Sequence, residues 1–225
     1  SFSVGKIIAM KAAPKLCPVT LELGGKNPNI IMSDADLDIA IPGVIDGMRY
    51  TRQGQACTAG SRVYIHEKIY DKVLNGAVEK LSKLKMGNAL DEKSDIGAII
   101  SEEQLKRTLY YMDIAKKNSS TKILHGGNQS KGGDYKDGFY YEPTLLSGLA
   151  VSSPVCQEEV FGPVACAIPF KSFDEVMESA NDTQFGLSAV LWTKDLSRAL
   201  QFVDEIEAGF VQVNQCVAPR ANVSY

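Results

Sequence analysis

The amino-acid sequence predicts an α/β protein, a three-layer α/β/α domain whose central sheet is mostly parallel. Short apolar runs alternate along the chain with longer stretches of helical character, and this alternation is typical of parallel strands joined by covering helices. Of the 225 residues, 44% are hydrophobic and 23% charged, as in an ordinary globular domain. Because no repeat or linker divides the chain, we expect a single domain over residues 1–225.

The N-terminal half is expected to begin with a helix. Residues 4–15 have helical character, and the helix should stop near Pro14 and Pro18. Residues 67–83 are predicted to form an amphipathic helix, because apolar residues recur there at three- and four-residue steps. The remaining expected elements are strands at 19–23, 29–32 and 62–65, and a helix capped within 33–36 that reaches about Gln53.

The C-terminal half continues the alternation of strands and helices. Between its elements, residues 125–138 are rich in Gly, Lys and Asp, but they lack the spacing and strand-loop-helix context of a phosphate-binding loop. We therefore expect a surface connection there. The elements expected in this half are helices at 101–117, 173–181 and 196–206, and strands at 122–124, near 140–141, and at 164–169, 189–192 and 210–213.

Charge and hydropathy make several functions improbable on physical grounds. The net charge is −3 and no basic stripe is present, so nucleic acid is a poor partner. No apolar run approaches the roughly 20 residues of a membrane-spanning helix, and the N-terminus lacks the pattern of a secretory signal. We expect a protein without membrane or nucleic-acid partners, in the cytoplasm or another reducing compartment such as the mitochondrial matrix.

The cysteines are odd in number, widely spaced and without a CxxC pair, and the chain has only two histidines. This usage argues against a disulfide framework and predicts no metal site. The five cysteines are Cys17, Cys57, Cys156, Cys166 and Cys216.

Cys57 is the most informative thiol. It lies in a predicted loop between a helix and a strand, flanked by Gly54 and Gly60. Glycines let a loop expose a thiol and bring backbone N–H groups close to a bound oxyanion. Local context leaves both a reactive and a structural cysteine open.

Glu22 is a second candidate because it interrupts an apolar run just before Gly24 and Gly25. Ligands of open α/β sheets collect beyond the carboxyl ends of strands, so a carboxylate at the end of the predicted strand at 19–23 is either a functional acid or base, or a surface residue. A third cluster spans residues 157–163, where Gly162 and Pro163 fix the backbone and two adjacent acids precede an aromatic ring. It is either a solvated turn or a loop that presents one carboxylate and the ring to a partner.

Four motifs, in order along the chain, resemble hallmarks of the aldehyde dehydrogenases. Leu-Glu-Leu-Gly-Gly-Lys-Asn-Pro at 21–28 is similar to the glutamate signature of that family, and residues 50–61 around Cys57 are similar to its cysteine signature. Glu-Glu-Val-Phe-Gly-Pro at 158–163 and Tyr-Glu-Pro-Thr at 141–144 resemble two further hallmarks. Together they span most of the chain and predict the catalytic domain of such an enzyme.

The resemblance implies a covalent mechanism. The Cys57 thiolate would attack the aldehyde carbonyl, hydride transfer would leave a thioester, and Glu22 would activate water for hydrolysis to the carboxylic acid. The substrate would be a small-molecule aldehyde.

The resemblance also implies NAD or NADP as cofactor. Glu159 would bind the nicotinamide-ribose hydroxyls, Phe161 would pack near the ring, and the Leu23 carbonyl would meet the carboxamide. Ser1 to Gly5 resembles the end of a segment whose helix N-terminus faces the pyrophosphate, although the leading glycine of that segment is absent. Residues 1–20 are then expected to be a remnant adjoining a dinucleotide-binding domain that lies outside this chain.

Two alternatives stay open beside this prediction. A CoA-acylating enzyme would cleave the thioester with a thiol, but such enzymes generally lack a base at the position of Glu22. A non-catalytic binding or structural protein on the same scaffold is disfavoured by the retention of Cys57 and Glu22. We expect the full-length parent to be a homo-oligomer, and the chain by itself to be nearly inactive. Cys216 is expected near the substrate pocket, but the sequence does not specify the aldehyde.

Overall fold

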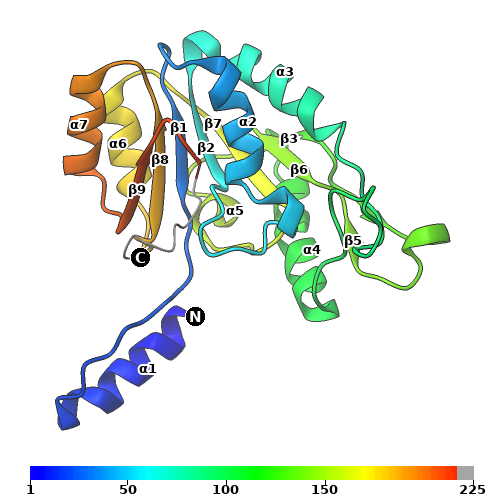
Figure 1. Cartoon of the computed structure of the whole chain (residues 1–225), viewed down its shortest axis with the longest axis horizontal. Helices are drawn as coiled ribbons and strands as arrows, with labels where there is room; N and C mark the ends of the chain where they lie inside the picture. The colour runs from blue at the N-terminus through cyan, green and yellow to red at the C-terminus, as the bar shows by residue number, and fades with distance from the viewer. Residues whose placement is uncertain (217–225) are drawn as a thin grey trace.

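The computed structural model describes residues 1–216, and its core is a seven-stranded sheet in the order β3-β6-β7-β2-β1-β8-β9 (Figure 1). Neighbouring strands are parallel except for β3, which runs antiparallel to β6. A separate pair, β4 and β5, is antiparallel. The strands are β1 (Pro28–Ile31), β2 (Arg62–His66), β3 (Lys122–His125), β4 (Gln129–Ser130), β5 (Tyr140–Tyr141), β6 (Thr144–Ser147), β7 (Val164–Phe170), β8 (Ser188–Trp192) and β9 (Phe210–Val213).

Helices cover both faces of the sheet, which makes the fold the expected three-layer α/β/α arrangement. Alternate residues of a strand point to opposite faces. Ile30 and Tyr64 accordingly belong to a core with α4–α7, whereas Ile31, Val63 and Ile65 belong to a core with α2 and α3. The helices are α1 (Phe2–Ala12), α2 (Leu37–Gly47), α3 (Tyr70–Leu81), α4 (Glu102–Lys117), α5 (Pro154–Gln157), α6 (Phe173–Asn181) and α7 (Leu196–Glu205).

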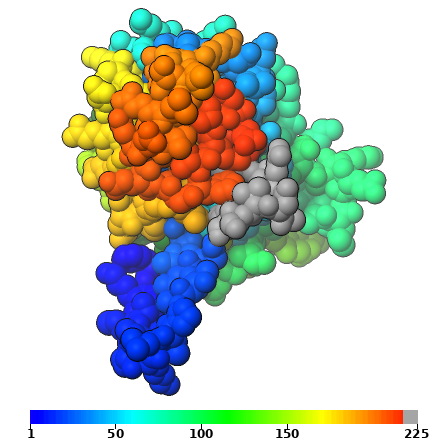
Figure 2. Space-filling view, turned by 60° about the vertical axis from the view of Figure 1, so that its left-hand side comes forward, coloured from blue at the N-terminus to red at the C-terminus, as the bar shows by residue number. Residues whose placement is uncertain are grey.

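The predicted strand at 19–23 is wrong. Residues 18–27 form an irregular connection between α1, which stands apart from the body, and β1 (Figures 1 and 2). A strand requires a hydrogen-bonded neighbour, and this connection, with Val19 and Glu22 exposed, pairs with none of the described strands. The apolar residues at 19, 21 and 23 match the alternating pattern of a strand, but this pattern does not show whether a neighbouring strand is there to pair with.

Three short elements were not predicted, namely β4, β6 and α5. Strand β6 is buried along its whole length between β3 and β7, and a four-residue run is too short to show periodicity. The expected surface connection at 125–138 is half exposed, with one buried residue, Gly127, and it contains β4 and one 3-10 turn, Gly133–Tyr135.

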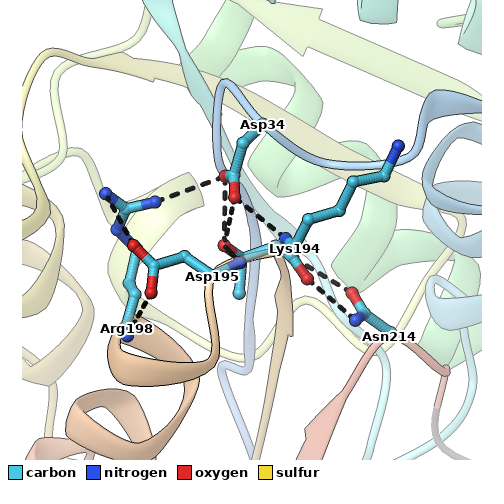
Figure 3. Close-up of polar contacts among 6 residues, drawn as sticks. Asp34, Lys194, Asp195, Arg198 and Asn214 are labelled. Atoms are coloured by element: carbon cyan, nitrogen blue, oxygen red, sulfur yellow. Dashed lines mark hydrogen bonds and ion pairs between the residues drawn. The ribbon is translucent and has the colours of Figure 1, made fainter.

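A polar cluster joins the carboxyl ends of β1, β8 and β9 (Figure 3). The Asp34 carboxylate accepts from the Thr193 hydroxyl at 2.9 Å, from the Lys194 N–H at 2.9 Å and from the Arg198 guanidinium at 3.3 Å. Asn214 exchanges two hydrogen bonds with the backbone of Thr193. Burial raises the pKa of Asp34, but these donors outweigh burial and hold its pKa below the ordinary value. The cluster therefore ties three strand ends together.

Within residues 1–216, no helix combines the length and the apolar character needed to cross a membrane.

Candidate active site

The sequence motifs meet at the amino ends of the central parallel strands. Gly25 lies just before β1, Cys57 lies in the loop before β2, and Glu159 and Phe161 lie in the loop before β7. The carboxyl-end location argued for Glu22 is therefore wrong. Parallel strands bring their amino ends to one edge of the sheet, so the segments that precede them come together whatever their separation in sequence.

Gly24 and Gly25 form the centre of this edge. The Gly25 N–H donates to Glu159 Oε1 at 3.1 Å. A Cβ atom on Gly24 would lie 2.5 Å from Glu159 Oε2, and one on Gly25 would overlap the carbonyl oxygen of Cys57. The structure thus brings Cys57, the nucleophile candidate, and Glu159, the ribose-binding candidate, against this pair of glycines. Neither glycine position has room for a side chain.

The Cys57 loop has an unusual backbone. Gln53 and Gly54 both have positive φ, 56° and 63°, and a Cβ on Gly54 would overlap the carbonyl oxygen of Gly162. This contact joins the Cys57 loop to the Glu159–Phe161 loop. The Cys57 side chain is a free thiol of intermediate exposure, as a nucleophile that must meet a substrate requires.

The Glu159–Phe161 loop is held by α4. Phe161 has a φ of 55°, a costly conformation for an aromatic residue that persists only where neighbours enforce it. Gln104 Nε2 donates to the carbonyls of Val160 at 3.0 Å and Phe161 at 2.7 Å, and Arg107 Nε donates to the carbonyl of Glu159 at 3.1 Å. The sequence analysis missed both α4 residues, because helical spacing shows that they share a face but not what that face contacts.

The adjacent acids Glu158 and Glu159 point to different partners. Glu158 accepts from the Tyr111 hydroxyl at 2.7 Å, whereas Glu159 accepts from Gly25. Burial, followed by the bond to Glu158, raises the pKa of Tyr111 to about 12. Glu158 therefore anchors the loop to α4, and Glu159 is the acid that reaches Gly25, where the motifs meet.

The start of α1 adjoins the same edge. Gly5 is the buried residue of α1, and a Cβ there would lie 2.9 Å from Leu23 Cδ2. A hollow of about 260 Å³ is lined by Phe2, Leu21, Leu23, Gly24 and residues 184–187. A second cavity, lined by residues 159–162 and the Cys57 loop, holds about 10 Å³, which is room for a single water. The hollow beside α1 is the larger of these two spaces, and it adjoins Gly24. Because Gly24 has no side chain, nothing at this position covers the Glu159 carboxylate.

Other singled-out residues lie less favourably. Glu22 is exposed, and no hydrogen bond or ion pair joins it to Cys57 in the part of the chain that the structure describes. Cys216 is half-buried beside Gly47 at the end of α2, and burial raises the pKa of its thiol. Lys26, which the sequence did not single out, is buried without a hydrogen-bond partner for its Nζ among residues 1–216, and burial lowers its pKa. Among residues 1–216, no three His, Cys, Asp or Glu side chains gather as a metal site would require.

Comparison with known proteins defines the family. The family model described as "Aldehyde dehydrogenase family" matches residues 1–225. The chain is 42% identical over 218 residues to an aldehyde dehydrogenase of Deinococcus radiodurans and 40% identical over 218 residues to one of Rhodospirillum rubrum. Each alignment covers 94% of this chain and 42% of the relative. The chain therefore belongs to the aldehyde dehydrogenase family and spans less than half the length of these relatives.

Solved structures agree with this assignment. The NAD+ complex of an aldehyde dehydrogenase from Bacillus cereus superposes with a TM-score of 0.91 at 36% identity, covering 98% of this chain and 44% of that one. A 3,6-anhydro-L-galactose dehydrogenase in complex with NAP gives a TM-score of 0.94 at 33% identity, covering 98% of this chain and 46% of that one.

Proposed function

We propose that the protein containing this chain oxidises aldehydes to carboxylic acids with NAD or NADP, with Cys57 as the nucleophile and Glu22 as the general base. The observation that carries the proposal is the meeting of Cys57, Gly25 and Glu159 at one edge of the sheet. Family membership supports the same chemistry. The chain is proposed to be a single catalytic domain over residues 1–225, in which residues 1–20 adjoin a dinucleotide-binding domain.

The first step forms a covalent bond between Cys57 and the substrate. The Cys57 thiolate attacks the carbonyl carbon and gives a thiohemiacetal oxyanion, which the Cys57 backbone N–H stabilises. This carbon would then lose a hydride to the oxidised nicotinamide that NAD or NADP supplies when bound, which would leave a thioester on Cys57. The partial exposure of Cys57 lets the carbonyl carbon approach.

Hydrolysis of the thioester releases the acid. Glu22 removes a proton from a water, the resulting hydroxide attacks the thioester carbon, and the C–S bond breaks to return the Cys57 thiolate. Glu22 lies two residues before Gly24, at an exposed position of the connection between α1 and β1, and Gly25 of this connection lies against the Cys57 carbonyl. The proposal requires its carboxylate, which no hydrogen bond or ion pair holds elsewhere among residues 1–216, to turn toward the Cys57 loop.

The residues at the amino ends of β1, β2 and β7, here called the amino edge, also suit a dinucleotide. Glu159 would accept hydrogen bonds from ribose hydroxyls, Phe161 would cover the nicotinamide, and the Leu23 carbonyl would accept from the carboxamide. Ser1 and Gly5 at the start of α1 would face the pyrophosphate, because the first turn of this helix contains no acidic residue and has no side-chain cap. The hollow lined by Phe2 and Leu23 also reaches Gly24, which lies against the Glu159 carboxylate.

The test is a nucleophile substitution in the full-length protein. Cys57→Ser should lower the dehydrogenase kcat at least a thousandfold, whereas Cys17→Ser, at an exposed thiol, should leave it within about threefold. Retained turnover in Cys57→Ser would defeat the assignment. Product analysis with and without CoA distinguishes the hydrolytic enzyme from a CoA-acylating one, and iodoacetamide labelling of Cys57 at pH 7 distinguishes both from an inert structural protein.

A further inference from the structure

Asn27 is a buried amide whose hydrogen-bonding groups are all used at the amino edge. Its Nδ2 donates to the carbonyl of Cys57 at 2.7 Å and to the carbonyl of Ala59 at 2.9 Å. Its Oδ1 accepts from the Ser188 N–H at 3.0 Å. One side chain therefore connects the residue before β1 with the loop before β2 and the start of β8.

The two carbonyls that Asn27 binds lie on either side of Thr58. A peptide unit is planar, so fixing the Cys57 carbonyl also fixes the direction of the Thr58 N–H and restricts the ψ angle of Cys57. The loop has further ties at its C-terminal end, where the Gly60 N–H donates to Gly47 and the Ser61 N–H donates to Ala59. Asn27 supplies the bond to Cys57 itself.

The contacts of Gly25 show that the Asn27 amide lies beside the Glu159–Phe161 loop. A Cβ on Gly25 would meet both the Cys57 carbonyl and the Asn27 side chain, with 2.7 Å to Oδ1. The Gly25 N–H binds Glu159. A shift of the Asn27 amide would therefore move the nucleophile relative to Gly25 and Glu159.

We propose that Asn27 is the positioning residue of the Cys57 nucleophile, which it orients by holding the carbonyls of Cys57 and Ala59. The inference rests on the proposed function, because it assigns Asn27 a role in that same reaction. An amide suits this role because two carbonyl oxygens require two donors on one group and the Ser188 N–H requires an acceptor. Aspartate keeps the shape and the acceptor but loses both donors, and it would direct negative charge at the two carbonyls.

The chain offers a matched control in Asn29, two residues further along. Asn29 is equally buried, donates to the Gly43 carbonyl at 3.3 Å and accepts from the Trp192 indole at 2.7 Å. Its amide makes two hydrogen bonds where that of Asn27 makes three, and neither of the two goes to Cys57 or Ala59. Asn29→Asp thus reproduces the cost of placing a carboxylate in the interior without disturbing the Cys57 carbonyl.

The experiment compares Asn27→Asp, Asn27→Ser and Asn29→Asp in the full-length protein. We expect Asn27→Asp to lower kcat ten- to hundredfold, as small misplacements of a reacting group do, with the KM for NAD or NADP changed less than threefold. The alkylation rate of Cys57 by iodoacetamide should fall, and its pH profile should move to higher pH because a carboxylate is introduced nearby. Asn27→Ser, which keeps one donor, should lie between Asn27→Asp and the wild type. Asn29→Asp should lower Tm without these effects.

Two outcomes would overturn the inference. One is a wild-type kcat and alkylation profile in Asn27→Asp; the other is equal losses in Asn27→Asp and Asn29→Asp when both are corrected for the folded fraction. Cys57→Ser separates this failure from that of the proposed function. If Cys57→Ser abolishes turnover while Asn27→Asp is normal, only the role of Asn27 is lost.

Discussion

At the amino edge, the atoms of neighbouring residues determine which side chain a position can hold. Gly24 is the clearest case, because a Cβ there would lie 2.5 Å from one carboxylate oxygen of Glu159 and 2.9 Å from the other. The sequence showed that Gly24 and Gly25 follow closely after Glu22. It could not show that the two glycines lie against the carboxylate of Glu159, more than 130 residues away in sequence.

We predict that Gly24→Ala raises the KM for NAD or NADP about tenfold in the full-length enzyme. The methyl group would push the Glu159 carboxylate away from the place where ribose hydroxyls bind, and a single charged hydrogen bond is worth about 1.5–3 kcal/mol. Steady-state kinetics with varied cofactor measure this effect. Gly209→Ala is the control, since a Cβ there would have no neighbour closer than 3.8 Å. Equal KM values in the two variants would contradict the prediction.

At the scale of elements, helix α4 determines the shape of the Glu159–Phe161 loop. Gln104 and Arg107 are one helical turn apart and bind three consecutive carbonyls of that loop. The helix predicted at 101–117 is confirmed as α4, Glu102–Lys117. The sequence could not predict which loop those polar side chains would bind, because that loop arrives from a distant part of the chain.

We predict that Gln104→Ala lowers the free energy of unfolding by about 1–3 kcal/mol, because it leaves the Val160 and Phe161 carbonyls without this donor. Urea denaturation of the wild type and the variant measures the difference. The control is Lys106→Ala on the same helix, whose exposed ion pair with Glu102 should contribute less than about 1 kcal/mol. A loss in Gln104→Ala no greater than in the control would show that α4 does not support the loop.

The cluster around Asp34 should give the fold a defined dependence on pH. Because the folded-state pKa of Asp34 lies below its ordinary value of 3.8, the stabilisation is present above that value and is lost as the pH falls through the folded-state pKa. We expect Asp34→Asn to lower the free energy of unfolding by about 1 kcal/mol near pH 7, and by progressively less below pH 3.8. Urea titrations at several pH values measure this difference, and Asp137→Asn on the exposed loop after β4 should show little effect. A difference that grew at low pH would be inconsistent with the assigned pKa direction.

At the scale of the whole molecule, α1 shows the least integration with the body. It stands apart in Figures 1 and 2, and its large apolar side chains are exposed, among them Ile7, Ile8 and Met10. Exposed apolar surface of this extent marks a face that binds another element. The chain spans 42% of the relatives with which it was compared, and we propose that the dinucleotide-binding domain covers this face in the full-length protein.

This proposal predicts weak cofactor binding by the chain alone. Glu159, Phe161, Leu23 and the start of α1 would contact only the nicotinamide half and the pyrophosphate of a dinucleotide, so a large share of the binding surface would be missing. Calorimetric titration of the isolated chain with NAD should show no micromolar binding, whereas the full-length protein should bind it. Micromolar binding by the isolated chain would contradict the proposed division of the cofactor site.

The sequence by itself determined the α/β class, nearly all helices and strands of the sheet, and the family, because periodicity and contiguous motifs are local properties. It also marked Cys57, Glu22 and Glu159 as candidate site residues. Only the tertiary structure decided that the segment at 19–23 is not a strand and that the motifs meet at amino rather than carboxyl strand ends. It also revealed the contacts that Asn27, Gln104 and Arg107 make with the site loops. These properties depend on hydrogen-bond partners and close approaches from distant parts of the chain, and neither is encoded in the spacing of neighbouring residues.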